Sequence, residues 1–296
     1  MKAPRVSLEQ WRALQAVVDH GGFAQAAEAL HRSQSSVSYT LSRLQEQLGV
    51  PLLTIEGRKA VLTEAGAVLV HRSRQLTEQA SQLELLAHNL EQGWEAEVHL
   101  VVDAAYPTER LARALTAFMP LSQGCRVQLR EEVLSGVEDC LLTGDADLAI
   151  AGINIPGYLA TQLDAVEFIA VAHPGQALHQ LGRPLTHEDL RTQLQVVIRD
   201  SGERKPRDSG WLGAEQRWTV ASLGTAAELV ASGLGFAWLP VHEIRHFMVD
   251  GRLKPLPLQQ GATRAHPLYL YLNKDKPAGP ATEVLAQLIV QHSDKT

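Results

Sequence analysis

Residues 34–43 place amide, hydroxyl and guanidinium groups on one side of a predicted helix. Val37, Leu41, Leu44 and Leu48 recur at intervals of four, three and four, so they share an apolar face that can pack inward. The opposite face carries small polar side chains in place of the Lys and Glu of an ordinary solvated helix. Such groups match the donors and acceptors of base edges, so this helix is predicted to enter the DNA major groove.

Nine residues in this region are candidates for DNA contact. Gln34 can make a bidentate contact with adenine, and Tyr39 offers its ring to a thymine methyl group and its hydroxyl to a phosphate. Arg43 suits a phosphate, which positions the protein without specifying sequence. For each residue the alternative is an ordinary surface side chain. The full set is Arg32, Gln34, Ser35, Ser38, Tyr39, Ser42, Arg43, Arg58 and Lys59.

The flanking segments can position this helix. An alanine-rich segment, 24–29, precedes it and predicts a slim helix that crosses its neighbour closely. Pro51 disfavours helix at the residue before it, so the helix ends near Gly49. Two short extended segments, 52–55 and 59–62, then predict a hairpin with Gly57 in its turn and Arg58 near its tip.

The run from Leu8 to Gly66 resembles the winged helix-turn-helix of LysR-type transcriptional regulators. The matching positions are Trp11, Val17, Gly22, Phe23, Ala26, Ala27, Leu30, Ser33, Gln34, Val37, Ser38, Leu44, 48–52 and 62–66. Two positions depart from the family pattern, because Ser35 stands where proline is frequent and Ile55 where arginine is usual. The resemblance implies double-stranded promoter DNA as a partner, with RNA polymerase as a further candidate.

A long helix is expected after the hairpin, capped by Thr63 and ending at Gly93. One leucine falls in each heptad, with Ser or Ala four residues after the first three, which is typical of a helix that pairs with another. We therefore expect a dimer, with tetramers as an extension. The alternative is a helix packed on its own body. The predicted seam consists of Leu69, Leu76, Leu83 and Leu90.

Charge is distributed unevenly along the chain. The net charge of the 296 residues is −6, yet residues 1–60 hold seven Lys and Arg against five Asp and Glu. A mildly basic head on an acidic body fits a DNA-binding module joined to a module of another kind. The sequence has neither a run of eighteen apolar residues nor an apolar leader, so a cytoplasmic protein without membrane contact is expected.

From residue 97 onward the pattern alternates between strands and helices, which predicts a parallel sheet covered on both faces. The expected strands are 98–102, 125–129, 147–152, 168–172, 195–198, 236–240 and 269–272, and the expected helices are 108–118, 135–142, 225–232 and 280–291. This part resembles the two-lobed effector domain of LysR-type regulators, which has the architecture of periplasmic solute-binding proteins. The fold class expected for the whole chain is therefore α/β with an all-α N-terminal head.

The resemblance sets the expected domain boundaries. They are a winged helix-turn-helix at 1–65, a linker and dimerisation helix at 66–93, and an effector-binding domain at 94–296. We name its two halves lobe I (94–166 and 268–296) and lobe II (167–267), with the chain crossing between them near 164–167 and 262–268.

The cleft between the lobes is the expected site for a small-molecule effector. Helix N-termini there suit a carboxylate, and Arg199 can add a charge-assisted contact. Asp103, with Glu131 or Glu132 near it, suggests an amine on the ligand; the alternative is a solvated acidic loop. By resemblance the candidate residues are Asp103, Ala104, Ala105, Tyr106, Glu132, Leu134, Asn154, Arg199, Ser201 and Ser222.

Other kinds of site find less support in the sequence. Cys125 and Cys140 can form a redox switch, but buried inert thiols fit their strand and helix positions better. His242 and His246 lie four residues apart without a third ligand, so neither a metal nor a cofactor is expected. An enzyme is not expected either, because nucleophile-elbow and phosphate-loop motifs are missing. The leading function is an effector-responsive regulator; the alternative is an occluded cleft controlled by a protein partner or redox state.

Overall fold

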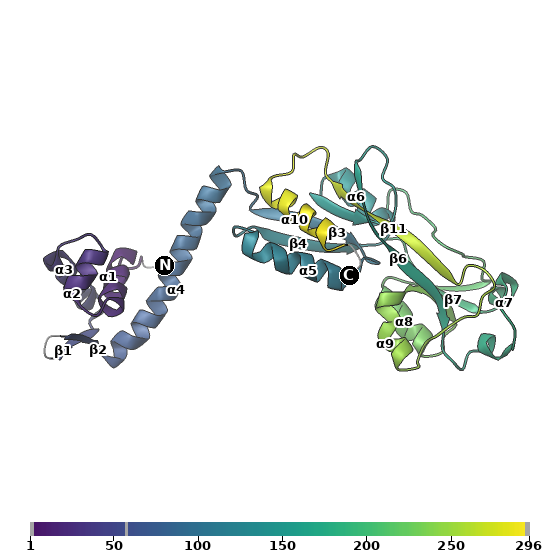
Figure 1. Ribbon diagram of the computed structural model, residues 1–296, viewed down its shortest axis with the longest axis horizontal. Helices are drawn as coiled ribbons and strands as arrows, with labels where there is room; N and C mark the ends of the chain where they lie inside the picture. Colours follow the sequence, from purple (N-terminus) through teal and green to yellow (C-terminus); the bar gives the residue numbers. More distant parts are fainter. Residues whose placement is uncertain (1–2, 57–58, 294–296) are drawn as a thin grey trace. The chain divides into compact units, whose positions relative to one another are not determined.

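The computed structural model describes residues 3–56 and 59–293, which separate into two units between Asn89 and Leu90 (Figure 1). The first unit contains a helical head and most of a long helix, α4. The second unit is built on one large sheet. Among the described residues, no helix is long and apolar enough to span a bilayer.

Three helices pack together in the head. Ser7 begins the first through a capping box, in which its hydroxyl accepts from the Gln10 amide and its own amide donates to the Gln10 side chain. Ala26 and Ala27 are almost fully buried in the second helix, so their small side chains allow the close crossing predicted from sequence. The helices are α1 (Leu8–Asp19), α2 (Phe23–Ala29) and α3 (Gln34–Leu48).

A hairpin joins the head to the long helix, α4 (Glu64–Glu91), and its strands are β1 (Leu53–Glu56) and β2 (Lys59–Leu62). The predicted turn residues, Gly57 and Arg58, lie outside the described residues. Thr63 caps α4, since its hydroxyl accepts from the Gly66 amide at 2.9 Å and donates to the Pro51 carbonyl at 2.8 Å. The predicted capped helix is thus observed.

In the second unit, nine strands of the described residues form one sheet, in the order β4-β3-β5-β11-β6-β9-β7-β8 with β10 paired to β6. The strands are β3 (Glu97–Asp103), β4 (Arg126–Glu132), β5 (Leu148–Ala151), β6 (Ala160–Ala172), β7 (Leu194–Ile198), β8 (Gln216–Val220), β9 (Phe236–Pro240), β10 (Lys254–Pro255) and β11 (Thr263–Leu272). The helices are α5 (Thr108–Phe118), α6 (Ser135–Thr143), α7 (His187–Arg191), α8 (Leu223–Ala231), α9 (Val241–Val249) and α10 (Pro280–Gln291), with short 3-10 turns η1 (Met119–Leu121) and η2 (Ala177–Gln180).

The sheet is mixed, and only part of it is the parallel sheet predicted from the alternation of elements. β3 pairs in parallel with β4 and β5, and β7 with β8 and β9. β6 and β11 pair with each other in antiparallel fashion and extend through both lobes, so the predicted crossovers lie inside these two long strands. Their register shifts between His266 and Leu268, where Pro267 has no amide hydrogen to donate to the ladder.

Each lobe buries a core on both faces of the sheet. In lobe I, α5 and α10 cover one face around Leu100 and Phe118, whereas α6 covers the other around Val101 and Leu141 (Figure 1). In lobe II, α8 and α9 cover one face of the sheet. Segments before α7 and after β7 cover the opposite face around Phe236. The loops at the strand ends are thus fixed from both sides.

Candidate nucleic-acid interface and ligand cavity

The polar face of α3 is open to solvent in the described head. Val37, Leu41 and Leu44 are at most 2 % exposed and pack inward as predicted, whereas the Tyr39 side chain is 69 % exposed. The other outward candidates are also exposed, namely Gln34, Ser35, Ser38, Ser42 and Arg43. This face can meet a flat partner without any rearrangement of the head.

The start of α3 is fixed by Ser33 without the proline that is frequent in the family. The Ser33 hydroxyl accepts from the Ser36 amide at 3.2 Å and lies 3.1 Å from the Ser35 hydroxyl. At the other end, Gly49 adopts a left-handed conformation with φ 71°. A defined first turn gives Gln34 a fixed position on the helix.

Two of the candidate cations form ion pairs at the surface. Arg32 pairs with Glu9, and Arg43 pairs with Glu46 at 2.7 Å. Exposed pairs of this kind contribute about 0–1 kcal/mol, so either guanidinium can exchange its carboxylate for a phosphate at low cost. Arg58 and the side chain of Lys59 lie outside the described residues.

The leucines of the predicted seam on α4 divide into two groups. Leu69 is half-buried and packs against the head core, next to the buried Val70. Leu76, Leu83 and Leu90 are 46 %, 67 % and 48 % exposed. Three of the four leucines therefore present apolar surface that a second helix can cover, while Leu69 belongs to its own head.

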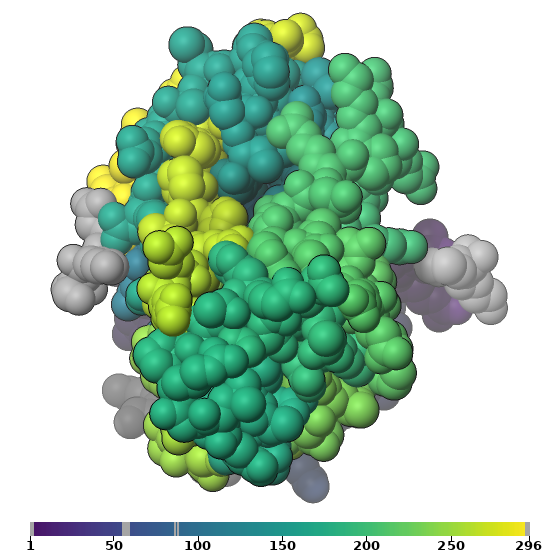
Figure 2. All heavy atoms as spheres, turned by 90° about the vertical axis from the view of Figure 1, so that its right-hand side faces the viewer, coloured from purple at the N-terminus to yellow at the C-terminus, as the bar shows by residue number. Residues whose placement is uncertain are grey.

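A cavity of about 890 Å³ lies between the two lobes. Lobe I contributes the loops that follow β3, β4 and β5, and lobe II contributes β7 with the segment after it, 199–212. The middle of β6 and β11 forms a further wall. In Figure 2 the segment 199–212, in green, and β11, in yellow-green, lie on two sides of a hollow.

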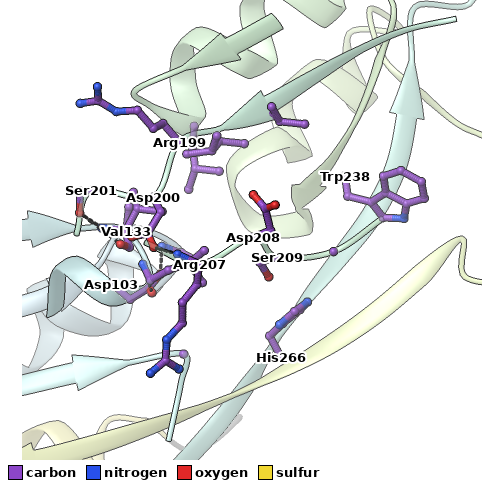
Figure 3. A pocket seen from close by; sticks show the side chains of 18 of the residues that line it. Asp103, Val133, Arg199, Asp200, Ser201, Arg207, Asp208, Ser209, Trp238 and His266 are labelled. Carbon is purple, nitrogen blue, oxygen red and sulfur yellow. Dashed lines mark hydrogen bonds between the residues drawn. The ribbon is translucent and has the colours of Figure 1, made fainter. Parts of the chain in front are cut away.

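Six of the ten predicted effector residues line the cavity: Asp103, Ala104, Ala105, Leu134, Arg199 and Ser201. The other four lie elsewhere. Tyr106 is 3 % exposed in the core of lobe I, and Glu132 is buried beside Arg130. Asn154 is exposed beyond the cavity, and Ser222 caps α8 through the Thr225 amide. Figure 3 shows the Arg199 side chain extending away from Asp208 and His266.

Asp103 is a buried carboxylate that joins three loops of lobe I. It accepts from the Ala105 amide at 2.9 Å, from the Leu134 amide at 3.3 Å, and from the amide of Gly152. Burial raises the pKa of Asp103 above its ordinary value, and these hydrogen bonds oppose the rise. Because backbone donors already engage both oxygens, its position favours a structural role over recognition of a ligand amine.

Aromatic and basic residues of lobe II form the part of the site that the sequence analysis missed. The rings of Trp211 and Trp238 lie 5.8 Å apart, and Arg264 stacks over Trp238 at 4.8 Å. His266 meets Phe168 edge-on at 5.0 Å, near Asp208 and Ser209 in Figure 3. Arg264, His266 and Leu268 alternate along β11, and this period-two pattern begins five residues before the predicted strand, 269–272.

Comparison with known proteins identifies the chain. Residues 8–67 match the family described as bacterial regulatory helix-turn-helix protein, lysR family, and residues 91–294 match the LysR substrate binding domain. This chain belongs to the LysR-type transcriptional regulators. The function expected from sequence is thereby confirmed: it is a DNA-binding regulator with an effector-binding domain, and not an enzyme.

Individual relatives of this LysR-type regulator are distant. The Escherichia coli regulator YhaJ is 29 % identical over 86 % of both chains, and PunR of the same species is 27 % identical over 82 % of this chain and 80 % of its own. Among solved structures, LysG from Corynebacterium glutamicum with bound effector Arg has a TM-score of 0.53 at 21 % identity, covering 97 % of this chain and 98 % of its own. ArgP from Mycobacterium tuberculosis has a TM-score of 0.54 at 20 % identity, covering 96 % of both chains. These structures share the fold.

The two cysteines of this LysR-type regulator are buried on opposite faces of lobe I. Cys125 lies in the core beneath α5, and Cys140 lies on the buried side of α6 in the core on the other face. Burial, followed by the charges of nearby carboxylates such as Glu95, raises the pKa of Cys125 to about 11. Burial also raises the pKa of Cys140. Both thiols are protonated at neutral pH and react slowly with oxidants.

Proposed function

We propose that this regulator reads operator DNA through the outward face of α3, with Gln34, Ser35, Ser38, Tyr39 and Ser42 at base edges. The observation that carries the proposal is the exposure of this whole face while Val37, Leu41 and Leu44 fill the core behind it. Arg32 and Arg43 then hold phosphates on either side of the base contacts. Arg58 and Lys59 stay predictions from the sequence.

Genomic footprinting with purified protein tests this proposal and yields the operator. Gln34→Ala is expected to weaken operator binding by about 5- to 150-fold, because a bidentate base contact contributes about 1–3 kcal/mol of discrimination. Gln75→Ala, on the exposed side of α4, serves as the matched control. Unchanged operator affinity of the Gln34 variant contradicts a base contact from this residue.

The proposed quaternary arrangement is a dimer formed along α4. Leu76, Leu83 and Leu90 support it, because isolated helices rarely leave one exposed leucine in every heptad. Two heads then read two half-sites of an approximate palindrome. We propose that the head comprises residues 1–65, the linker 66–93 and the effector domain 94–296. We also propose that the protein is located in the cytoplasm, because its DNA target is found there. A contact with RNA polymerase stays a prediction.

We further propose that the cavity binds a planar anion as effector. Trp211 and Trp238 offer aromatic walls, and Arg217 and Arg264 line the same cavity without an ion pair among the described residues. An acidic group on the ligand can satisfy these guanidinium groups, and a ring can stack on the tryptophans. The engagement of Asp103 by backbone amides disfavours the amine-bearing ligand considered from sequence.

Tryptophan fluorescence provides the test. Aromatic carboxylates are expected to quench the emission of the full-length protein in a saturable manner, and Trp238→Phe is expected to reduce the amplitude. Aliphatic amines of similar size serve as the comparison. Saturable binding confined to amines contradicts the proposed ligand class. The burial and raised pKa of both cysteines give no support to the redox alternative.

A further inference from the structure

The carboxylate of Asp200, in lobe II, occupies the N-terminus of α6, in lobe I. One oxygen accepts from the Ser135 amide at 3.0 Å, and the other accepts from the Ser135 hydroxyl at 2.6 Å. The amides of Gly202 and Arg207 add bonds of 3.0 Å and 2.5 Å. Four donors therefore saturate this carboxylate, and two of them belong to the opposite lobe.

The helix has no other cap at this end. Leu134, the residue before α6, has a φ of 50° and offers no side-chain acceptor. The helix dipole and the free Ser135 amide favour an anion at this position. Burial raises the pKa of Asp200, but its hydrogen bonds outweigh burial, so the pKa lies below the ordinary value. Asp200 is consequently charged at neutral pH and complements the helix end.

The lobes approach each other too closely here for a larger residue. A Cβ atom added at Gly202 would lie 2.1 Å from the Ser135 hydroxyl and 2.7 Å from the Ser135 carbonyl carbon. Next to it, the Ser201 hydroxyl accepts from the Val133 amide at 2.8 Å. Arg207 pairs with Glu138 of α6 at 2.6 Å. The contact is thus a continuous junction across the cleft, made by one segment of lobe II.

We propose that Asp200 is a specificity-determining residue of the cleft, a built-in carboxylate that holds the lobes together and excludes ligand carboxylates from α6. The inference rests on the proposed effector cavity, which Asp200 lines. It deepens that proposal, because the acidic group of an effector must then bind at the Arg217 and Arg264 side of the cavity. Helix N-termini of the cleft were predicted from sequence to suit a ligand carboxylate, and the N-terminus of α6 receives a carboxylate from the chain itself.

Chemical rescue tests this inference in the full-length protein. Asp200→Ala removes the carboxylate and is expected to lower the melting temperature by about 2–4 °C. Sodium acetate is then expected to restore the loss in a saturable way, at millimolar concentration, relative to sodium chloride of equal ionic strength. The wild-type protein is expected to show a smaller acetate-specific shift, because its α6 position is filled and only the Arg217 and Arg264 side of the cavity is open to acetate.

Two variants separate this role from a general loss of packing. Ser135→Ala combined with Asp200→Ala is expected to weaken the acetate rescue, since the hydroxyl donor at 2.6 Å is gone. Asp250→Ala changes an exposed carboxylate of lobe II that does not line the cavity, and it is expected to leave both the melting temperature and the acetate response unchanged. If Asp200→Ala is not recovered folded, Asp200→Ser, which also removes the carboxylate and leaves room for acetate, replaces it in the same titration.

The outcomes of these acetate experiments are distinct from those of the experiments that test the proposed function. An acetate response equal in wild type and variant, or none in either variant, overturns the role of Asp200 and leaves DNA reading and aromatic ligands untouched. An acetate response larger in the Asp200 variant than in wild type supports the inference even if aromatic carboxylates fail to bind. In that case only the proposed effector class is withdrawn.

Discussion

The Gln15 side chain in α1 donates a 2.9 Å hydrogen bond to the Ser73 hydroxyl in α4, although 58 residues separate them. Ser73 is buried at 3 % exposure and passes its own hydrogen to the Val70 carbonyl. Gln15 also lies 3.2 Å from Thr77, one turn further along α4. The first half of the long helix is thereby fixed to the DNA-binding head by polar contacts as well as by its apolar side chains.

Gln15→Ala is expected to lower the free energy of unfolding of the head by about 1 kcal/mol, because the Ser73 hydroxyl loses its buried donor. Urea titration followed by circular dichroism measures the change. Gln75→Ala, whose side chain is exposed on α4, is the control and is expected to change stability by less than about 0.5 kcal/mol. Equal effects from both variants would show that the Gln15 contact contributes nothing.

Gly66→Ala is expected to destabilise the head by about 1–3 kcal/mol, because the added methyl group would overpack this point. A Cβ atom there would lie 2.0 Å from the Leu52 carbonyl oxygen, which is backbone and cannot rotate away. The control is Gly224→Ala in α8, where a Cβ atom meets nothing within 4 Å. The free energy of unfolding of that variant is expected to rise by about 0.5–1 kcal/mol. Thermal unfolding distinguishes the two, and a neutral Gly66 variant contradicts the close approach.

Arg43→Ala is expected to weaken binding to all DNA sequences and to lower the salt slope of the association constant by about 1, since one phosphate contact is lost. Fluorescence anisotropy between about 50 and 200 mM salt measures the slope. Arg252→Ala, which breaks a surface pair with Glu228 in the effector domain, is the control. An unchanged slope for the Arg43 variant would mean that this side chain does not touch a phosphate.

Leu83→Asp is expected to raise the dissociation constant of the dimer by at least about 10-fold, because burying a leucine contributes about 1.5–3 kcal/mol. Sedimentation velocity at several concentrations measures the shift. Leu181→Asp changes another exposed leucine, at 47 % exposure in lobe II, and is expected to leave the self-association unchanged. If only the Leu181 variant dissociates, α4 is not the dimer seam.

Acidification is expected to destabilise the effector domain through His266. Burial, followed by the charge of Arg264, lowers the pKa of His266, while Asp103 opposes the shift. The unfolded chain therefore binds a proton first, so stability present above about pH 6.5 is lost as the pH falls toward the folded pKa. Between pH 7.5 and 5.5, the melting temperature of His266→Gln is expected to fall less than that of wild type. His179 and His242, whose pKa values are also lowered, are common to both proteins. Equal losses contradict the assignment.

The sequence by itself determined the head and the long helix. The spacing of Val37, Leu41 and Leu44 identifies the buried side of α3, and therefore the exposed one, because a helix of 3.6 residues per turn relates neighbours only three or four positions apart. Ser33, Gly49 and Thr63 mark helix ends through equally local hydrogen bonds. For such elements the pattern and its physical cause lie within a few residues.

Only the tertiary structure decided the aromatic and basic wall of the cavity and the partner of Asp200. β6 and β11 pair across about one hundred residues, and that pairing turns Arg264 and His266 toward the site. The Asp200 carboxylate reaches Ser135 from 65 residues away, and its sequence neighbours give no sign of this partner. Contacts between distant segments depend on how whole elements pack, so the occupant of the α6 N-terminus became visible only when both lobes were folded.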